Sequence, residues 1–307
     1  MHFPHVLKRV LVSLALLALV AAPAAAQIED QISAYTGKNA RGYLQPLADA
    51  FGADLNSGIF RTGHIKKMGP SVRLELQIMS VLFGDDDRTF RAVTEQGFSP
   101  EQYREAPTVV GSVKAVSVEN EVGTSYAFPG GFDLNSFALA VPQLRVGAVF
   151  GTEAIVRYFS IKLGDDDLGD LGFWGFGLRH SISQYLGPVF PVDLAAGFLW
   201  QKLTLGENEQ GDHLISSSAF SMGVQASRKF AKVLVPYAGL SYDTHSMDVS
   251  YEREDDDLKT TIDVDFEKTS MLHLTIGLML DVPVLSMFAE YNIAGQSSFV
   301  LGIGLGY

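Results

Sequence analysis

The sequence contains no cysteine among its 307 residues. Disulfides commonly stabilise small exported domains, so an exported chain without them needs another source of stability. Beyond residue 26 no run of 18 apolar residues occurs, which excludes a bundle of membrane-spanning helices. Basic residues are also few, with 23 Lys and Arg against 35 Asp and Glu and a net charge of −12. This balance argues against nucleic-acid binding, because cations are needed to neutralise phosphates.

Residues 1–26 have the features of a secretory signal peptide. Lys8 and Arg9 precede the apolar stretch 10–21, and small residues follow at 24–26. The apolar stretch is too short for a typical membrane span, and small residues are typical of a cleavage site. We therefore expect Sec-type export with cleavage near Ala26, and an uncleaved N-terminal anchor is the alternative.

Alternation with a period of two is the main signal in the rest of the chain, and it is clearest at 260–280. Even positions there are mostly apolar, such as Leu272, Leu274 and Ile276, whereas odd positions are polar or small. Period-two alternation indicates a strand with two unlike faces. Globular strands usually have about 5–6 residues. A tilted strand that crosses a bilayer needs roughly 9–11 and often continues beyond it.

Ten further segments show strand patterns of this kind: 57–66, 72–78, 136–150, 153–163, 171–182, 192–200, 213–228, 233–251, 285–293 and 298–307. Bacterial outer-membrane barrels usually have an even number of strands, so about 12 strands are expected, within a range of roughly 10–14. The sequence thus predicts an all-β protein, a transmembrane antiparallel up-and-down β-barrel.

The connections alternate between short turns and longer acidic loops at 164–170, 206–212 and 251–257. Short periplasmic turns and longer outer loops are typical of outer-membrane barrels, and the three acidic loops then all lie outside. The last strand, 298–307, is apolar on one face and ends in Tyr307. It resembles the C-terminal signal through which the barrel-assembly machinery recognises such proteins. The predicted location is therefore the bacterial outer membrane.

Two regions do not alternate cleanly. The apolar spacing in 27–56 predicts a short N-terminal helical segment that plugs the lumen or lies at its rim, which leaves 57–307 for the barrel. The stretch 84–135 is rich in turn residues and charges. We expect it to form a long loop with one or two short strands.

Polar residues on the inward side of the predicted strands are the candidate functional residues. The lumen-facing candidates are Arg73, Glu75, Arg145, Arg179, Asp263, Asp265, Glu267, His273 and Glu290, together with Gln77, Gln143 and Asn292. Both charge signs are present, so ion pairs across the lumen are plausible. One interpretation is a polar core that fills the barrel, and the other is a pore or ligand cavity. Barrels of this size lie between filled and open, so both remain.

Catalytic and metal sites have little support in the sequence. His180 and His245 each have a serine nearby, but neither lies in a nucleophile motif with an identifiable orienting group. The acidic runs 85–87, 165–167 and 255–257 lack the spacing of a calcium loop, which favours solvated loop charges over loose divalent-ion binding. We expect no catalytic residues, no metal site, no cofactor and no enzymatic activity.

Segments 43–47, 51–52, 142–153 and 177–182 are similar to segments that recur in a family of uncharacterised outer-membrane β-barrel proteins of Gram-negative bacteria. More loosely, an N-terminal plug that leads into a barrel resembles the long-chain fatty-acid transporter family. That resemblance implies uptake of hydrophobic molecules, but no site residue matches a motif of that family.

Three functions follow, in decreasing order of preference: a passive channel or transporter for small or hydrophobic solutes, a structural or adhesive barrel that displays its acidic loops, and an enzyme acting on lipids. The expected partners are outer-membrane lipids, lipopolysaccharide and the barrel-assembly machinery, without nucleic acid.

Overall fold

The structure is a computed structural model that describes residues 35–95, 97–162, 170–186, 191–206, 213–255 and 258–306. The predicted signal peptide, Tyr307 and most of the acidic loop residues at 164–170 and 206–212 lie outside these ranges.

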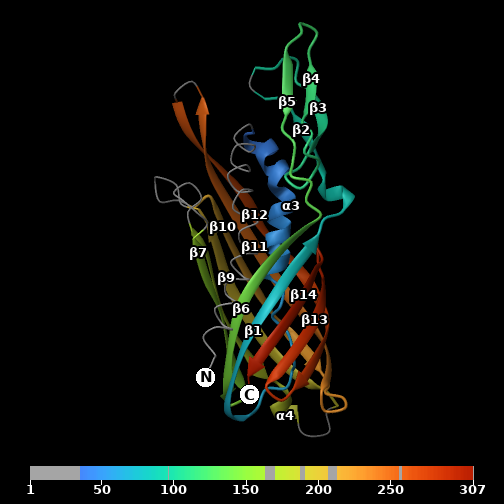
Figure 1. Cartoon of the computed structure of the whole chain (residues 1–307), viewed down its shortest axis with the longest axis vertical. Coiled ribbons are helices and arrows are strands. Elements are labelled where there is room, and N and C mark those ends of the chain that lie inside the picture. The colour runs from blue at the N-terminus through green and yellow to red at the C-terminus, as the bar shows by residue number, and fades with distance from the viewer. Residues whose placement is uncertain are drawn as a thin grey trace, which may run out of the picture.

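A closed antiparallel barrel of ten strands dominates the described chain (Figure 1). Its strands are β1 (Met68–Leu82), β6 (Ser136–Val149), β7 (Thr152–Lys162), β8 (Asp170–Ser181), β9 (Asp193–Leu205), β10 (Ile215–Ser227), β11 (Leu234–Asp255), β12 (Leu258–Val282), β13 (Leu285–Ile293) and β14 (Ser298–Gly306). The last strand closes on the first, with Leu74 opposite Leu305 and Ile78 opposite Leu301. Closure leaves no unpaired edge. The predicted up-and-down barrel is confirmed.

The barrel has ten strands, at the lower limit of the predicted range and two fewer than the single value of 12. The predicted strand at 57–66 is wrong, because this stretch lies inside the barrel and pairs with no strand. The value of 12 comes from eleven recognised segments plus one strand added to make the number even. Without a strand at 57–66, ten segments remain and no strand needs to be added. The other ten predicted strands all correspond to barrel strands.

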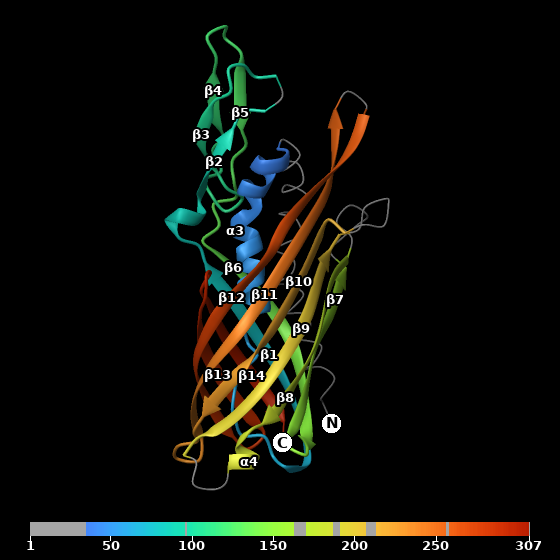
Figure 2. The same ribbon diagram turned by 180° about the vertical axis from the view of Figure 1, so that it is seen from behind.

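The two ends of the barrel differ, and we call them the lower and upper ends as in Figure 1. Short connections and the one-turn helix α4 (Ser183–Leu186) lie at the lower end. At the upper end β11 and β12, of 22 and 25 residues, project as a hairpin above their neighbours (Figure 2). β13 and β14 have only 9 residues each, so the wall is low beside β12.

Helix α3 (Gly37–Leu55) stands in the upper mouth of the barrel (Figure 1). Its apolar side chains Tyr43, Leu44, Leu47 and Phe51 are buried, which fits the helical segment expected within 27–56. Proline 46 lies inside this helix, which continues through it to Leu55. No helix in the described ranges is long and apolar enough to cross a membrane.

The expected long loop at 84–135 contains two small hairpins above the barrel. They are formed by β2 (Thr89–Val93) with β3 (Tyr103–Pro107) and by β4 (Val116–Glu119) with β5 (Ser125–Phe128), after a single 3-10 turn, η1 (Asp85–Asp87). The first hairpin is attached to α3 by Asn39, whose amide nitrogen donates to the Val93 carbonyl at 2.7 Å. The helix and the hairpins therefore form one upper unit.

The outer face of the barrel carries many exposed apolar side chains. Exposed side chains on β12 are Leu272, Leu274, Ile276, Leu278 and Leu280, and on β14 they are Phe299, Leu301, Ile303 and Leu305. Trp174 and Trp200 lie edge to face on the same surface, with ring centroids 4.6 Å apart. Water-soluble monomers rarely expose a continuous apolar patch larger than a few hundred Å². An apolar belt flanked by aromatic residues instead suits the hydrocarbon of a bilayer.

A β-bulge divides β12 and changes which residues face inward. His245 of β11 is opposite Thr269, but Met247 is opposite Phe266, so β12 carries one more residue than β11 between these pairs. One inserted residue exchanges the two faces of a strand. Above the bulge the even residues Val264 and Phe266 are therefore buried.

The prediction that Asp263 and Asp265 face the lumen is wrong for this reason. Both are exposed on the outer face of the projecting hairpin. The side chain of Glu267, at the bulge, lies outside the described part of the structure. The apparently continuous alternation at 260–280 joins two segments of opposite orientation.

Cysteine labelling tests this exchange of faces, because the chain has no cysteine of its own. We expect Asp263→Cys to react with a membrane-impermeant maleimide at least about tenfold faster than Val264→Cys, since only exposed thiols react readily. Equal rates, or faster labelling at position 264, would show that the bulge is absent.

Candidate functional site: the plugged lumen

The lumen is occupied by the chain itself. After α3 ends at Leu55, residues 56–62, here called the plug segment, run down inside the barrel before β1 begins at Met68. Ser57, Ile59, Phe60 and Arg61 of this segment are all buried. The plug segment has no secondary-structure partner, so its backbone polar groups need partners on the wall.

Wall side chains supply these partners. Arg157 of β7 donates to the carbonyl oxygens of Ser57 and Gly58 at 2.9 and 2.8 Å. Arg145 of β6 donates to the Ile59 carbonyl at 2.9 Å. Below them the Arg179 guanidinium donates to the Thr62 carbonyl. Three arginines from three adjacent strands thus hold four of the seven carbonyls of the plug segment.

Arg61 is the only charged residue of the plug segment, and its partners lie on β13 and β1. Its Nη1 donates to Glu290 Oε2 at 2.9 Å and its Nη2 to Gln77 Oε1 at 2.6 Å. Its Nε lies 3.9 Å from Glu75 Oε2, and its guanidinium carbon lies 3.3 Å from the centroid of the Phe288 ring. Both carboxylates are buried, so Arg61 supplies charge compensation that water cannot supply.

A second cluster of ion pairs lies on the wall beside the plug segment. Glu153 accepts from Arg145 at 3.0 Å and from Arg179 at 2.9 Å, and Glu75 accepts from Arg145 Nε at 3.1 Å. Arg157 has no carboxylate partner among the described residues, and it donates to the side-chain oxygens of Gln143 and Gln201, each at 2.8 Å. Such a network is costly to disrupt one partner at a time.

Most of the lumen-facing candidates lie where the sequence places them. Glu75, Arg145, Arg179, His273 and Glu290 are buried inside the barrel. Arg73 lies nearer the lower opening and pairs with Asp281 at 3.3 Å. Only the upper part of β12 departs from the expected arrangement.

Four central residues were missed as site residues: Arg61, Glu153, Arg157 and Tyr237. Arg61 lies in segment 57–66, which the sequence predicts to be a strand although it contains two glycines. Glu153, Arg157 and Tyr237 occupy odd positions of segments already recognised as strands, so alternation alone could have placed them with Ile155 and Val235 on the inward side.

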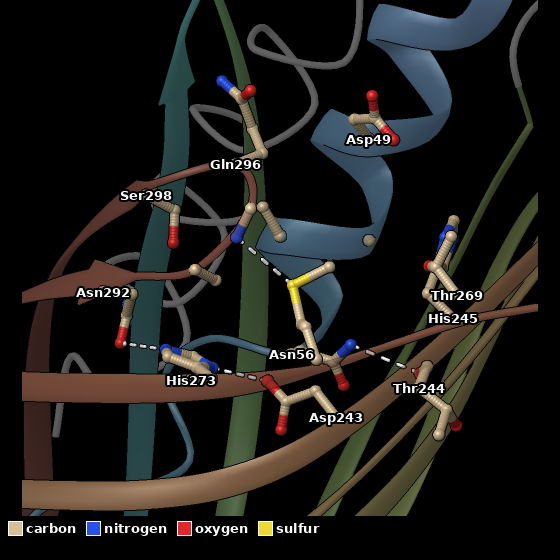
Figure 3. A pocket seen from close by; sticks show the side chains of 15 residues that line it. Asp49, Asn56, Asp243, Thr244, His245, Thr269, His273, Asn292, Gln296 and Ser298 are labelled. Atoms are coloured by element: carbon tan, nitrogen blue, oxygen red, sulfur yellow. Dashed lines mark hydrogen bonds and ion pairs between the residues drawn. The ribbon is translucent and has the colours of Figure 1, made fainter.

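Two cavities flank the plug segment. The upper cavity, of about 230 Å³, is bounded by the end of α3, by β11 and β12, and by the low β13–β14 connection (Figure 3). The lower cavity, of about 610 Å³, opens at the turn end and is bounded by Arg61 and Thr62. Asn56 borders the upper cavity and Arg61 the lower one, so the intervening residues of the plug segment separate them.

Polar groups line the upper cavity. His273 Nδ1 lies 2.5 Å from Asp243 Oδ2, and its Nε2 lies 2.9 Å from Asn292 Oδ1 (Figure 3). Asn292 in turn donates to Ser57 Oγ at 3.2 Å. This series of contacts links the lining of the upper cavity directly to the plug segment.

The two histidines considered for catalysis have different surroundings. His245 Nε2 lies 2.8 Å from Ser217 Oγ, and both residues are buried. His180 lies at the lower rim and contacts Thr152, Gln184 and Tyr185. Neither histidine has a carboxylate partner in the described structure, so neither forms a complete triad. No described group of three His, Asp or Glu side chains could hold a metal ion. The expectation that the protein is not an enzyme stays a prediction.

Asp54, one residue before the end of α3, is completely buried, and neither carboxylate oxygen has a hydrogen-bond partner in the described structure. Burial raises the pKa of this carboxyl well above its ordinary value. Its folded-state pKa is higher than that of the unfolded chain, so stability falls as pH rises between the two values.

Asp54→Asn removes this ionisation. We expect the variant to be more stable than the original protein by about 1–3 kcal/mol above the raised pKa, because no buried carboxylate then forms. The advantage should shrink as the pH is lowered through that pKa. Urea unfolding in vesicles at several pH values, followed by tryptophan fluorescence, measures it. Exposed Asp86→Asn is the control, and equal pH dependence of both variants would contradict the assignment.

The fold and the lumen define the class: a ten-stranded outer-membrane-type β-barrel whose lumen is plugged by its own N-terminal region. The chain belongs to a family described as a family of unknown function (DUF6588), whose profile matches residues 7–307. This agrees with the expected membership of an uncharacterised barrel family. No curated protein matches the sequence.

Solved structures similar to this chain include three outer-membrane or transport proteins. The attachment invasion locus protein Ail of Yersinia pestis is 10% identical, with 78% of this chain and 99% of that chain covered and a TM-score of 0.29. The outer membrane protease OmpT of Escherichia coli is 7% identical, with coverages of 80% and 98% and a TM-score of 0.35. The toluene transporter TbuX of Ralstonia pickettii is 10% identical, with coverages of 78% and 88% and a TM-score of 0.29.

Proposed function

We propose that the protein is a gated channel of the bacterial outer membrane for small polar solutes, and that the plug segment is its gate. The observation that carries the proposal is the pair of cavities separated by the plug segment and the wall side chains that contact it. The apolar belt supports insertion in the bilayer, with the short turns in the periplasm and the projecting hairpins outside.

The chemistry of the plug contacts supports a gate over a permanent filling. Buried ion pairs stabilise a protein no better than apolar side chains of similar volume. A lumen that only had to be filled could therefore use apolar residues, whereas this one uses arginines that donate to backbone carbonyls. Water can replace such contacts when the plug segment moves. An open state a few kcal/mol above the closed one would be populated at roughly 0.1–10%.

The polar lining favours polar solutes. Asn56, Asp243, His273 and Asn292 line the upper cavity, and charged side chains line the lower one. Uptake of hydrophobic molecules, which the likeness to long-chain fatty-acid transporters implies, is the alternative. The same proposal includes export with cleavage near Ala26 and contact with lipopolysaccharide. It also includes recognition of 298–307 by the barrel-assembly machinery.

Gly58→Ala tests the gate. Gly58 has φ +70°, which disfavours a side chain, and an added Cβ would lie 2.4 Å from Gln77 Oε1. We expect the variant to show at least about tenfold more open time in planar bilayers, since the closed plug loses about 1–2 kcal/mol or more. Gly37→Ala is the matched control, because Gly37 also has a positive φ but no atom within 4 Å of its added Cβ. Indistinguishable currents from the two variants would overturn the proposal.

The folded hairpins above the barrel favour a second candidate, an adhesive barrel. Both hairpins belong to the 84–135 region, which is attached to α3. For example, the Tyr43 hydroxyl of α3 donates to the Gly130 carbonyl at 3.0 Å. Deleting β4–β5, residues 116–128, should then abolish cell-surface binding and leave the conductance unchanged. Unchanged binding after the deletion would dismiss the adhesive role.

A further inference from the structure

The lower cavity has an excess of positive charge. Seven cationic side chains line it: Arg61, Lys66, Arg73, Arg145, Arg179, Lys229 and Lys232. Four acidic side chains line it with them: Glu75, Glu153, Asp193 and Asp281. This sign is opposite to that of the whole chain, whose net charge is −12.

The acidic residues are already used by close partners. Glu75 and Glu153 are paired with arginines of the same wall. Asp281 is shared by two cations, at 3.3 Å from Arg73 and 2.7 Å from Lys229. Asp193 lies 3.4 Å from the ring of His64. Asp193 is therefore the one acidic lining residue without an arginine or lysine partner in the described structure, and the lining keeps an excess of cations, seven against four.

Lys66 and Lys232 are exposed, line the cavity and form no ion pair in the described structure. They reach it from different elements, Lys66 from the stretch below the plug segment and Lys232 from the β10–β11 turn. A concave surface with one sign of charge and low-dielectric walls concentrates ions of the opposite sign. The cavity volume of about 610 Å³ is within the usual range for small-molecule sites.

We propose that the lower cavity binds small oxyanions, that is, solutes with phosphate or carboxylate groups. The anion would lie between Lys66, Lys232 and the two cations that share Asp281, Arg73 and Lys229. The proposal of binding stands on the cavity alone. Its consequence for transport, that the open channel prefers anions to cations, rests on the proposed channel function. The cavity is bounded by the plug residues Arg61 and Thr62 as well as by the barrel wall, which favours a dissolved anion over a lipid headgroup.

The binding test uses inorganic phosphate and the full-length protein in phosphatidylcholine vesicles. We expect saturable phosphate binding that weakens at high salt. In Lys66→Gln/Lys232→Gln the affinity should fall at least about tenfold, because two charges facing the anion are lost. The control Arg104→Gln/Lys114→Gln removes two exposed cations of the upper unit and should bind like the original protein. No phosphate binding, or equal loss in both variants, would overturn the proposal.

Two further arms separate the remaining outcomes. If phosphatidylglycerol in the vesicles displaces phosphate, the occupant is a lipid headgroup, and the proposal of a dissolved anion fails. With Gly58→Ala in a KCl gradient, the reversal potential should indicate preference for chloride over potassium. Cation preference would contradict the inferred selectivity while leaving the channel function intact. Phosphate binding without any current would support the binding site and contradict the channel function.

Discussion

Arg61→Ala is expected to raise the open-to-closed ratio of the channel by about two orders of magnitude or more. In the closed state Arg61 compensates Glu290 and Glu75, both buried. Truncating one partner of a buried ion pair costs about 3–5 kcal/mol, because the remaining charge stays uncompensated. In the open state water reaches these carboxylates, so the cost falls on the closed state alone. Single-channel recording measures the change directly.

A double variant separates the ion pair from general damage. Arg61→Ala/Glu290→Gln removes the uncompensated charge, so it should be open less often than Arg61→Ala alone. Arg88→Ala is the matched control, because half-buried Arg88 pairs at 2.8 Å with exposed Asp133 in the upper unit. Surface pairs contribute about 0–1 kcal/mol, so this variant should behave like the original protein. If Arg61→Ala showed no openings while remaining folded, the plug would not be the gate.

The barrel could be predicted from sequence because the bilayer imposes a simple rule on each strand. Lipid requires apolar side chains at every second position, and Leu274, Ile276 and Leu278 follow this rule on one strand without reference to any other. The same rule places Glu75, Arg145 and Glu290 on the inward side. Local alternation was therefore enough for ten strands and most of the lining.

Alternation within one segment cannot predict a feature that depends on pairing with another strand. The bulge of β12 is defined by pairing with β11, and no feature of 260–280 marks the position at which its faces exchange. Asp263 and Asp265 were misplaced for this reason.

The plug segment is held by contacts far apart in the chain, such as Arg157 with Ser57, whose positions differ by 100. A short stretch with Ile59 and Phe60 resembles a strand until its partners are known. The sequence predicts a helical plug or rim segment at 27–56, but the course of residues 56–62 inside the lumen could therefore not be predicted from it.

A reversible cross-link of the plug segment should switch the channel off and on. Ser57 Oγ and Ser298 Oγ lie 2.5 Å apart inside the barrel, one on the plug segment and one at the start of β14. Cysteines at these positions should be close enough for a disulfide. The cross-link holds the plug segment to the wall, whatever the strength of the contacts around Arg61. Because the native chain has no cysteine, no other disulfide can form.

The wall offers a matched control for this cross-link. Ser218 Oγ and Ser246 Oγ lie 3.0 Å apart on the neighbouring strands β10 and β11 and do not contact the plug segment. A disulfide between cysteines at these two positions links wall to wall and should leave the conductance unchanged under both oxidising and reducing conditions.

The most direct test of the gate is the current through Ser57→Cys/Ser298→Cys in the Arg61→Ala background, recorded before and after a reductant is added. The oxidised channel is expected to be silent, and reduction is expected to raise the current to that of Arg61→Ala alone. A current of the same size in the oxidised and reduced states would show that ions pass without displacing the plug segment, and would contradict the account.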